Sequence, residues 1–165
     1  MSGNDSGTGK LRLTGRFNHF WSTYCGPVAR FYGRVHQRLY VRSGGTRFAT
    51  LEGSPVFRLT VVGRKSGEPK PVMLMLARDG DDVLVCGSNG GNPGKPNWWK
   101  NLVAAGKAEV QVGRDSWPVD VRVVADEAEY ERHWRTLVAA YPNFATYAVL
   151  SERHFPIAVL SRATA

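Results

Sequence analysis

The 165-residue chain has only two cysteines, and their placement excludes several kinds of site. Cys25 and Cys86 lie far apart, without a C-x-x-C pair or a histidine at ligand spacing, so neither a zinc site nor a disulfide framework is indicated. The four histidines show no metal-ligand spacing either, and no metal is expected. No arrangement of Ser, His and Asp stands out as a hydrolytic triad. We therefore expect both cysteines to be buried thiols.

Long apolar runs are also missing. No stretch approaches the roughly 20 apolar residues that a membrane-spanning helix needs, and the first residues lack the basic-then-apolar pattern of a signal peptide. These absences predict a cytoplasmic protein. Apolar residues at 42% and charged residues at 22% are ordinary for one globular domain, which excludes a disordered or collagen-like chain.

Acidic residues are nearly absent from the first fifty positions, where eight lysines and arginines accompany a single aspartate. The other positions carry 14 basic and 13 acidic residues, so nucleic-acid binding would be confined to the N-terminal segment and is not expected. Residues 1–9 are rich in Gly and Ser and predict a disordered tail. Across 10–50, apolar residues recur every three or four positions, which predicts a basic amphipathic helix. Gly26-Pro27 either kinks this helix or divides it into two short helices.

Two interpretations of this helical segment remain open. Residues 10–47 would lie on an anionic membrane surface, making the protein peripheral on the inner face of the cell membrane. Alternatively, the aromatic face packs on the core and the arginine stripe faces water.

Short β-type runs separated by turns follow, and they define a domain over 51–165. The expected strands are 56–62, 71–78, 83–88, 108–112, 117–124 and 156–160. Hairpin signals at 79–82 and 113–115 favour antiparallel pairing. Helices are expected at 96–105, from Asp126 onward, and over 144–150. This order opposes a doubly wound parallel sheet and predicts an α+β fold, a small antiparallel barrel with flanking helices.

Two loops and one aromatic group are candidates for chemistry. In the basic loop 63–70, glycines let backbone N–H groups converge on an anion, but an exposed hairpin turn would have the same composition. The Gly-rich loop 88–96 leads into a helix start, where free N–H groups favour an anion or carbonyl; a plain flexible loop is the alternative. Tyr141, Phe144 and Tyr147 either line one pocket or pack within a helix.

The motifs together resemble the deazaflavin-dependent nitroreductase family. They are the run Leu59-Thr60-Val61-Val62-Gly63-Arg64-Lys65-Ser66-Gly67-Glu68-Pro69, Ser88-Asn89-Gly90-Gly91, Pro96-x-Trp98-Trp99-x-Asn101-Leu102, Tyr141-Pro142 and Pro156-Ile157. The resemblance covers about residues 50–162. It implies a split β-barrel related to FMN-binding barrels and the cofactor F420, an 8-hydroxy-5-deazaflavin.

The resemblance also implies roles for individual residues. Arg64, Lys65, Ser66 and Lys70 would hold the acidic tail of F420. The ring and linker would contact Met73, Met75, Cys86, Gly87, Ser88 and Asn89, and the site would be completed by Asn97, Trp98, Trp99 and Asn101. Ser88, Tyr141 and Tyr147 would be catalytic, with Phe144 and Tyr147 lining the substrate pocket.

The implied activity is hydride transfer from reduced F420 to an electron-poor lipophilic acceptor such as a quinone. Asn89, Phe144 and Met75 depart from the best-known pattern of the family, which implies an altered acceptor range. Two alternatives remain open. The chain would bind F420 or FMN as a carrier without turnover, or it would use FMN as its cofactor.

Overall fold

The structure is a computed structural model and describes residues 35–164. Its strands are β1 (Thr50–Leu51), β2 (Ser54–Val62), β3 (Pro69–Met75), β4 (Ala77–Asp79), β5 (Asp82–Cys86), β6 (Lys107–Val112), β7 (Asp115–Val123) and β8 (Ile157–Arg162). Its helices are residues 35–42, the 3-10 turn η1 (Asn89–Gly91), α3 (Asn97–Ala105), α4 (Glu127–Ala140) and α5 (Asn143–Ser151). The tail 1–9, the kink at Gly26-Pro27 and Cys25 lie outside the described residues.

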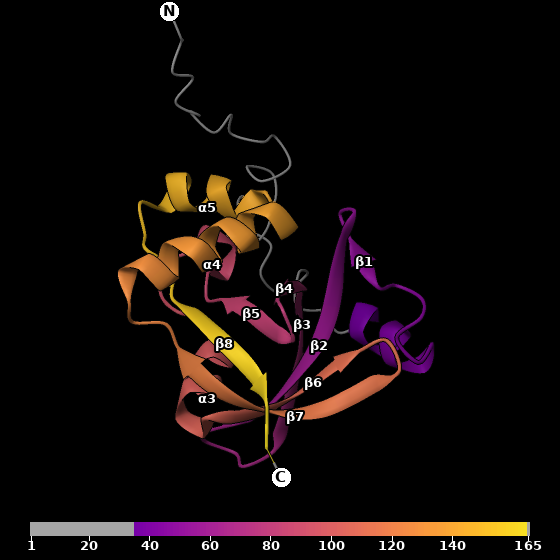
Figure 1. Cartoon of the computed structure of the whole chain (residues 1–165). Coiled ribbons are helices and arrows are strands. Elements are labelled where there is room, and N and C mark those ends of the chain that lie inside the picture. The colour runs from indigo at the N-terminus through magenta and orange to yellow at the C-terminus, as the bar shows by residue number, and fades with distance from the viewer. Residues whose placement is uncertain (1–34, 165) are drawn as a thin grey trace, which may run out of the picture.

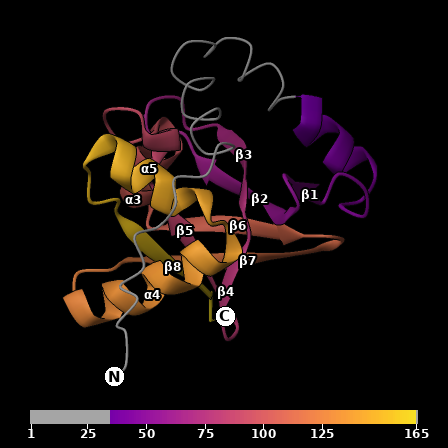
Figure 2. The same cartoon turned by 90° about the horizontal axis from the view of Figure 1, so that it is seen from above.

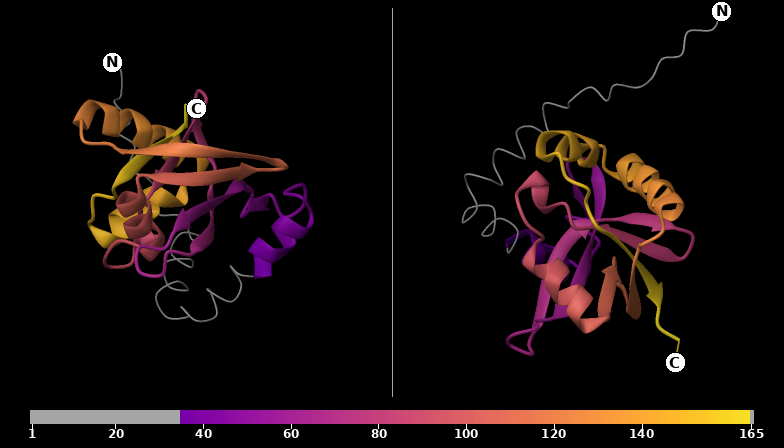
Figure 3. Two further views of the ribbon diagram at one scale, coloured as in Figure 1. Left: turned by 90° about the horizontal axis from the view of Figure 1, so that it is seen from below. Right: turned by 90° about the vertical axis from the view of Figure 1, so that its left-hand side faces the viewer.

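The strands form one curled, antiparallel sheet. Its order is β1-β2-β6-β7-β8-β5-β4, and β3 pairs with β2 beside this path. Helices α4 and α5 lie together on one side of the sheet (Figure 1), whereas α3 lies on the other side (Figure 3). This arrangement confirms the antiparallel split barrel with flanking helices. In the part of the chain that the structure describes, no helix is long and apolar enough to cross a bilayer.

Strands β5 and β8 separate two hydrophobic cores. Alternate side chains of a strand point to opposite faces, so Val83 and Val85 enter a first core with α3 while Leu84 and Cys86 enter a second with α4 and α5. Strand β8 divides in the same way. Because both faces are covered, these strands appear in the sequence as continuous apolar runs.

Local turn and cap chemistry is as predicted. The hairpin β4–β5 closes with Asp79 opposite Asp82, and the hairpin β6–β7 closes with Val112 opposite Asp115. Helix α4 begins after Asp126, whose carboxylate accepts a 2.8 Å hydrogen bond from the backbone N–H of Glu129.

Two expected strands differ from the structure, and one observed strand was not expected. The run 71–78 is broken at Leu76, whose N–H bonds to the carbonyl of Pro55, because the chain there changes partner from β2 to β5. The run 83–88 ends at Cys86, since the next residues turn toward η1. Strand β1 was not predicted because it has two residues and gives no alternation pattern.

Residues 35–48 dock at the far tip of the β6–β7 hairpin (Figure 2). Tyr40 is fully buried, and its hydroxyl accepts a 2.9 Å hydrogen bond from the N–H of Gly113. Gly45 lies so close to this turn that an added Cβ would stand 2.1 Å from the carbonyl oxygen of Gly113. Of the segment 10–50 predicted as helical, residues 35–42 are helix, whereas 43–48 form turns and Thr50 belongs to β1. The stretch 35–48 is anchored on the sheet.

Acid should weaken the junction between β7 and α4. The Glu129 carboxylate accepts hydrogen bonds from both Arg122 Nη atoms, at 2.9 and 2.6 Å, and lies 3.1 Å from His133 Nε2. The Arg122 hydrogen bonds, followed by the His133 contact, lower the pKa of Glu129 to about 2. A lowered pKa means that the folded state favours the charged form, so this stabilisation is complete above the unfolded value of about 4.3 and disappears as pH falls through 2.

Urea unfolding at pH 5 and pH 3 measures this effect. We expect the wild type to lose more free energy of unfolding between the two pH values than Glu129→Gln, which has no carboxylate to protonate. Equal losses in both proteins would show that Glu129 does not contribute to acid sensitivity.

Candidate functional site

A basic cleft of about 420 Å³ lies between the β2–β3 loop and the start of α3. The loop presents Arg64, Lys65 and Lys70 as exposed cations, and Ser66 lies among them. Lys70 Nζ is 2.7 Å from the Glu68 carboxylate, and this contact holds the pKa of Glu68 below its usual range. Arg64 and Lys65 are thus the loop's cations without that acidic neighbour, and they give the cleft its affinity for anions.

Asn101 fixes the shape of this cleft. Its Oδ1 accepts a 2.7 Å hydrogen bond from Nη1 of Arg64, and it stands 3.4 Å from the backbone nitrogen of the same residue. Asn101 is almost fully buried on α3, so the helix holds both the side chain and the backbone of the loop arginine. This contact orients the cation before a ligand arrives.

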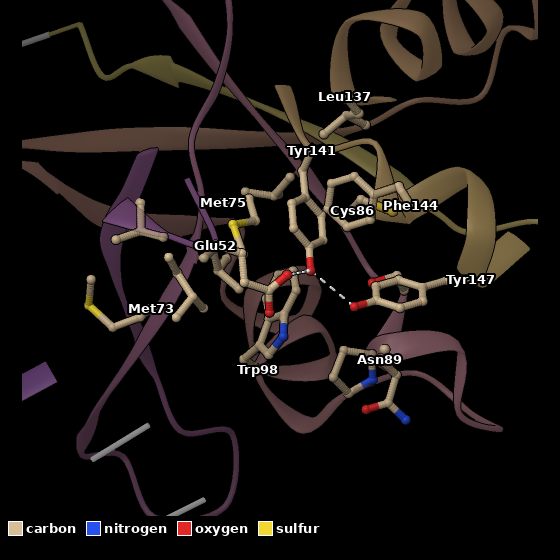
Figure 4. A pocket seen from close by; sticks show the side chains of 17 residues that line it. Glu52, Met73, Met75, Cys86, Asn89, Trp98, Leu137, Tyr141, Phe144 and Tyr147 are labelled. Atoms are coloured by element: carbon tan, nitrogen blue, oxygen red, sulfur yellow. Dashed lines mark hydrogen bonds between the residues drawn. The ribbon is translucent and has the colours of Figure 1, made fainter. Parts of the chain in front are cut away.

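A second cavity of about 470 Å³ adjoins the basic cleft and is mainly apolar. Its walls come from β3, the end of β5, the loop before α3, and the α4–α5 junction (Figure 4). The lining residues are Leu51, Glu52, Val56, Met73, Leu74, Met75, Val85, Cys86, Ser88, Asn89, Gly90, Pro96, Trp98, Leu137, Tyr141, Phe144 and Tyr147.

Trp98 lines both cavities, so the two lie on either side of one indole. Its neighbour Trp99 is only 2% exposed and packs in the first core, with the two rings edge to face at 5.7 Å. The position of α3 on the sheet decides which of the two indoles faces the cavities. A flat ring carrying an anionic tail matches this combination of an apolar cavity and a basic cleft.

Two phenols and a carboxylate meet in the apolar cavity (Figure 4). The hydroxyl of Tyr141 donates to Glu52 Oε2 at 3.0 Å and lies 3.1 Å from the hydroxyl of Tyr147. The amide of Asn143 donates to Tyr141 Oη and to Glu52 Oε2, each at 3.1 Å. Tyr141, which directly follows α4, and Tyr147, on α5, are each 5% exposed, so the two phenols are buried at the helix junction, whereas Glu52 is exposed.

The environment keeps two groups of the cavity protonated. Burial raises the pKa of Tyr141, and the nearby Glu52 charge adds to this effect against the opposing hydrogen bonds from Tyr147 and Asn143. Burial also raises the pKa of the Cys86 thiol, so this side chain is a neutral wall of the cavity and not a nucleophile. The buried state expected for Cys86 is confirmed.

The structure brings most of the expected site residues to the two cavities. The basic cleft contains Arg64, Lys65, Ser66, Lys70, Asn97, Trp98 and Asn101, and the apolar cavity contains Met73, Met75, Cys86, Ser88, Asn89, Trp98, Tyr141, Phe144 and Tyr147. Gly87 and Trp99 line neither. An added Cβ on Gly87 would stand 3.0 Å from the Trp99 ring. Gly87 and Trp99 therefore pack closely against each other behind the site.

Sequence reasoning missed Glu52, Leu137 and Asn143. Glu52 is in the two-residue turn between β1 and β2, and Asn143 begins α5. Leu137 is on the apolar face of α4, a pattern that indicates only packing. The left-handed backbone of Glu52, with φ of +53°, becomes visible only in the structure.

Comparison with known proteins identifies the family. Residues 32–162 match the model of the F420H(2)-dependent quinone reductases. The chain belongs to this family. It is 31% identical over 132 residues to an F420H(2)-dependent quinone reductase of Mycobacterium tuberculosis, a match that covers 78% of this chain and 89% of the relative.

Two solved structures agree with the assignment to the quinone reductase family. An F420-H2 dependent reductase, FDR-A, superposes with a TM-score of 0.61 at 31% identity, over 65% of this chain and 94% of that one. A chain described as a domain-swapped dimer superposes with a TM-score of 0.63 at 29% identity, over 78% of this chain and 96% of that one. Both likenesses extend over nearly the whole of the solved chains.

Proposed function

We propose that this protein is an F420H(2)-dependent oxidoreductase that reduces a quinone-type small-molecule acceptor. The observation that carries the proposal is the position of Trp98, which lines both a basic cleft and an apolar, aromatic cavity. This fits a cofactor with a flat ring and an acidic tail. The family of the chain is the second support.

We assign the cofactor tail to the basic cleft. Arg64 and Lys65 would pair with its negative charges, with Ser66 and Lys70 beside them, because cation-to-anion hydrogen bonds are the strong ones in proteins. Asn101 would hold Arg64 in place for this contact. Asn97 and Trp98 would lie along the linker, where the two cavities join.

We assign the reactive ring and the acceptor to the apolar cavity. When bound, reduced F420 supplies the hydride, so the protein has to orient the reactants and exclude water. Met73, Met75 and Ser88 line this cavity together with Trp98, and Ser88 would hydrogen-bond to the ring. Tyr141 and Tyr147 would position the acceptor and supply its proton, with Phe144 beside them.

A parallel fluorescence titration with oxidised F420 and FMN, followed by reduced F420 plus menadione, tests this function. We expect micromolar or tighter F420 binding, weaker FMN binding because FMN has a single phosphate, and oxidation of reduced F420 that depends on menadione. F420 binding without oxidation would favour a carrier. Preference for FMN, or failure to bind F420, would contradict the proposed cofactor site.

We also propose that residues 38–48 contact an anionic membrane surface. Leu39, Val41 and Phe48 are 38–48% exposed on this segment, so three large apolar side chains lie close together at its surface. Arg38, Arg42 and Arg47 are exposed among them. Apolar insertion together with attraction to anionic headgroups is how such surfaces bind lipid. A lipophilic quinone dissolved in the membrane would then reach the cavity from the lipid.

Sedimentation with phospholipid vesicles measures this contact. We expect the full chain to bind vesicles that contain phosphatidylglycerol and to stay in solution with phosphatidylcholine alone. Phe48→Ser with Leu39→Ser should lower binding about tenfold or more, since each removes an exposed apolar side chain worth about 1.5–3 kcal/mol when buried. Val149→Ser, at a 60% exposed position on α5, is the matched control.

A further inference from the structure

The turn between β1 and β2 places an acidic side chain at the mouth of the acceptor cavity. Thr50 pairs with Pro55 and Leu51 with Ser54, so Glu52 and Gly53 are the two central residues of the turn. Both have left-handed backbones, with φ of +53° and +80°. Turns of this kind favour Asn-Gly or Asp-Gly, and glutamate is a costly choice at the first position.

The length of the glutamate side chain accounts for its presence at this position of the turn. Its carboxylate accepts the hydroxyl hydrogen of Tyr141 at 3.0 Å and the amide hydrogen of Asn143 at 3.1 Å. Tyr141 is in turn 3.1 Å from Tyr147, and both phenols line the cavity. Glu52 is exposed, whereas the phenols are buried, so the three groups form a continuous path from solvent to the cavity (Figure 4).

We infer that Glu52, Tyr141 and Tyr147 form a proton relay that feeds the acceptor, with Glu52 as its solvent end. This inference rests on the proposed function. Hydride transfer oxidises the reduced cofactor and gives the quinone two electrons and one hydrogen, leaving one oxygen that needs a proton. Tyr147 gives its O–H proton to that oxygen, and Tyr141 gives its proton to Tyr147. The Glu52 carboxylate takes up a proton from solvent and passes it to Tyr141, which returns Glu52 to its resting state.

Hydroxyl groups suit this task because each can donate and accept, and the hydrogen rotates between the two partners. As the structure stands, Tyr141 donates toward Glu52, which is the resting direction with the carboxylate charged. Reversal of the two phenolic hydrogens turns the same contacts into a path toward the cavity. Asn143 bonds to both Tyr141 and Glu52 and holds them together during this change.

Substitutions at Glu52 separate this role from a structural one. Glu52→Gln keeps an oxygen that accepts from Tyr141 but cannot deliver a proton as an acid does. Glu52→Asn suits the turn better but is one methylene shorter. We expect kcat for menadione reduction to fall about tenfold or more in both, since proton transfer by a positioned group contributes at least that much. The dissociation constant for F420 should not change, and Tm of Glu52→Asn should not fall.

Glu109→Gln is the matched control, because Glu109 is an exposed glutamate on β6 that lines neither cavity. Wild-type kcat in Glu52→Gln would overturn the relay. Loss of kcat that accompanies a lower Tm or weaker F420 binding would overturn it as well, because it would assign Glu52 a structural or cofactor role. A larger solvent deuterium isotope effect on kcat in Glu52→Gln would support it.

A readout without turnover separates failure of the relay from failure of the proposed function. In protein labelled with 13C at the tyrosine ring carbon that bears the hydroxyl, Tyr141→Phe and Tyr147→Phe assign the two resonances. Glu52→Gln should shift both if the groups are linked, and a shift confined to Tyr141 would overturn the relay. If the wild type does not reduce menadione with reduced F420, the proposed function fails while the resonances still decide the link.

Discussion

Replacing Arg64 and Lys65 together with alanine is expected to weaken F420 binding at least about a hundredfold. Each hydrogen bond from a charged donor to an anion contributes about 1.5–3 kcal/mol, and tenfold in affinity corresponds to about 1.4 kcal/mol. Two such contacts in the basic cleft account for a loss of that size. Fluorescence titration of the variant measures it, and a weaker salt dependence of the remaining affinity should accompany the loss.

The control for this variant removes the same charge elsewhere. Lys107→Ala with Arg135→Ala takes two exposed cations from positions that line neither cavity. We expect its F420 affinity to stay within about threefold of the wild type, as only long-range attraction is lost. Ser88→Ala gives the complementary pattern, with a lower kcat and little change in affinity. The reverse pattern would reject the division of the site into tail and ring regions.

Gly45→Ala is expected to cost about 2–5 kcal/mol of unfolding free energy. Its backbone has φ of +71°, a conformation that costs a residue with a Cβ about 1–2 kcal/mol. The new Cβ would also stand 2.1 Å from the carbonyl oxygen of Gly113, and relief of such crowding costs about 1–3 kcal/mol more. Residues 35–48 must then shift from the β6–β7 turn, which also disturbs the contact with Tyr40.

Gly80→Ala isolates the steric part of this loss. Gly80 has φ of +61° with open space where a Cβ would lie, so it carries the backbone cost alone. Urea unfolding of both variants gives the two free energies. Similar losses of unfolding free energy in the two proteins would show that the backbone near Gly113 moves to accommodate the new Cβ. The close approach of Gly45 to Gly113 would then contribute little to stability.

Much of the fold follows from local patterns. Strands β5 and β8 are continuous apolar runs because both of their faces are buried. The start of α4 follows from a carboxylate that caps the N–H of Glu129. These signals depend on neighbours along the chain, so the sequence carries them directly.

The candidate site depends on contacts that local patterns do not contain. Glu52 meets Tyr141 across 89 positions of sequence, through a turn whose strand β1 has only two residues. Trp98 and Trp99 are adjacent and alike, and only the placement of α3 decides that Trp98 lines the cavities and Trp99 packs in the core. The basic cleft was predictable because its cations lie on one loop, but Asn101, which orients Arg64, follows 37 residues later.

Strands β5 and β8 each contribute side chains to both hydrophobic cores, which links the unfolding of one core to that of the other. Neither core can lose its packing while the other keeps both strands in place, so the barrel should unfold as a single cooperative unit. Backbone amides of these strands should then exchange with deuterated solvent only through global unfolding. Val85 and Cys86, which line the apolar cavity, should then exchange slowly, whereas Glu52 lines the same cavity from an exposed turn. Fluctuations that admit an acceptor or release a product therefore belong to this turn.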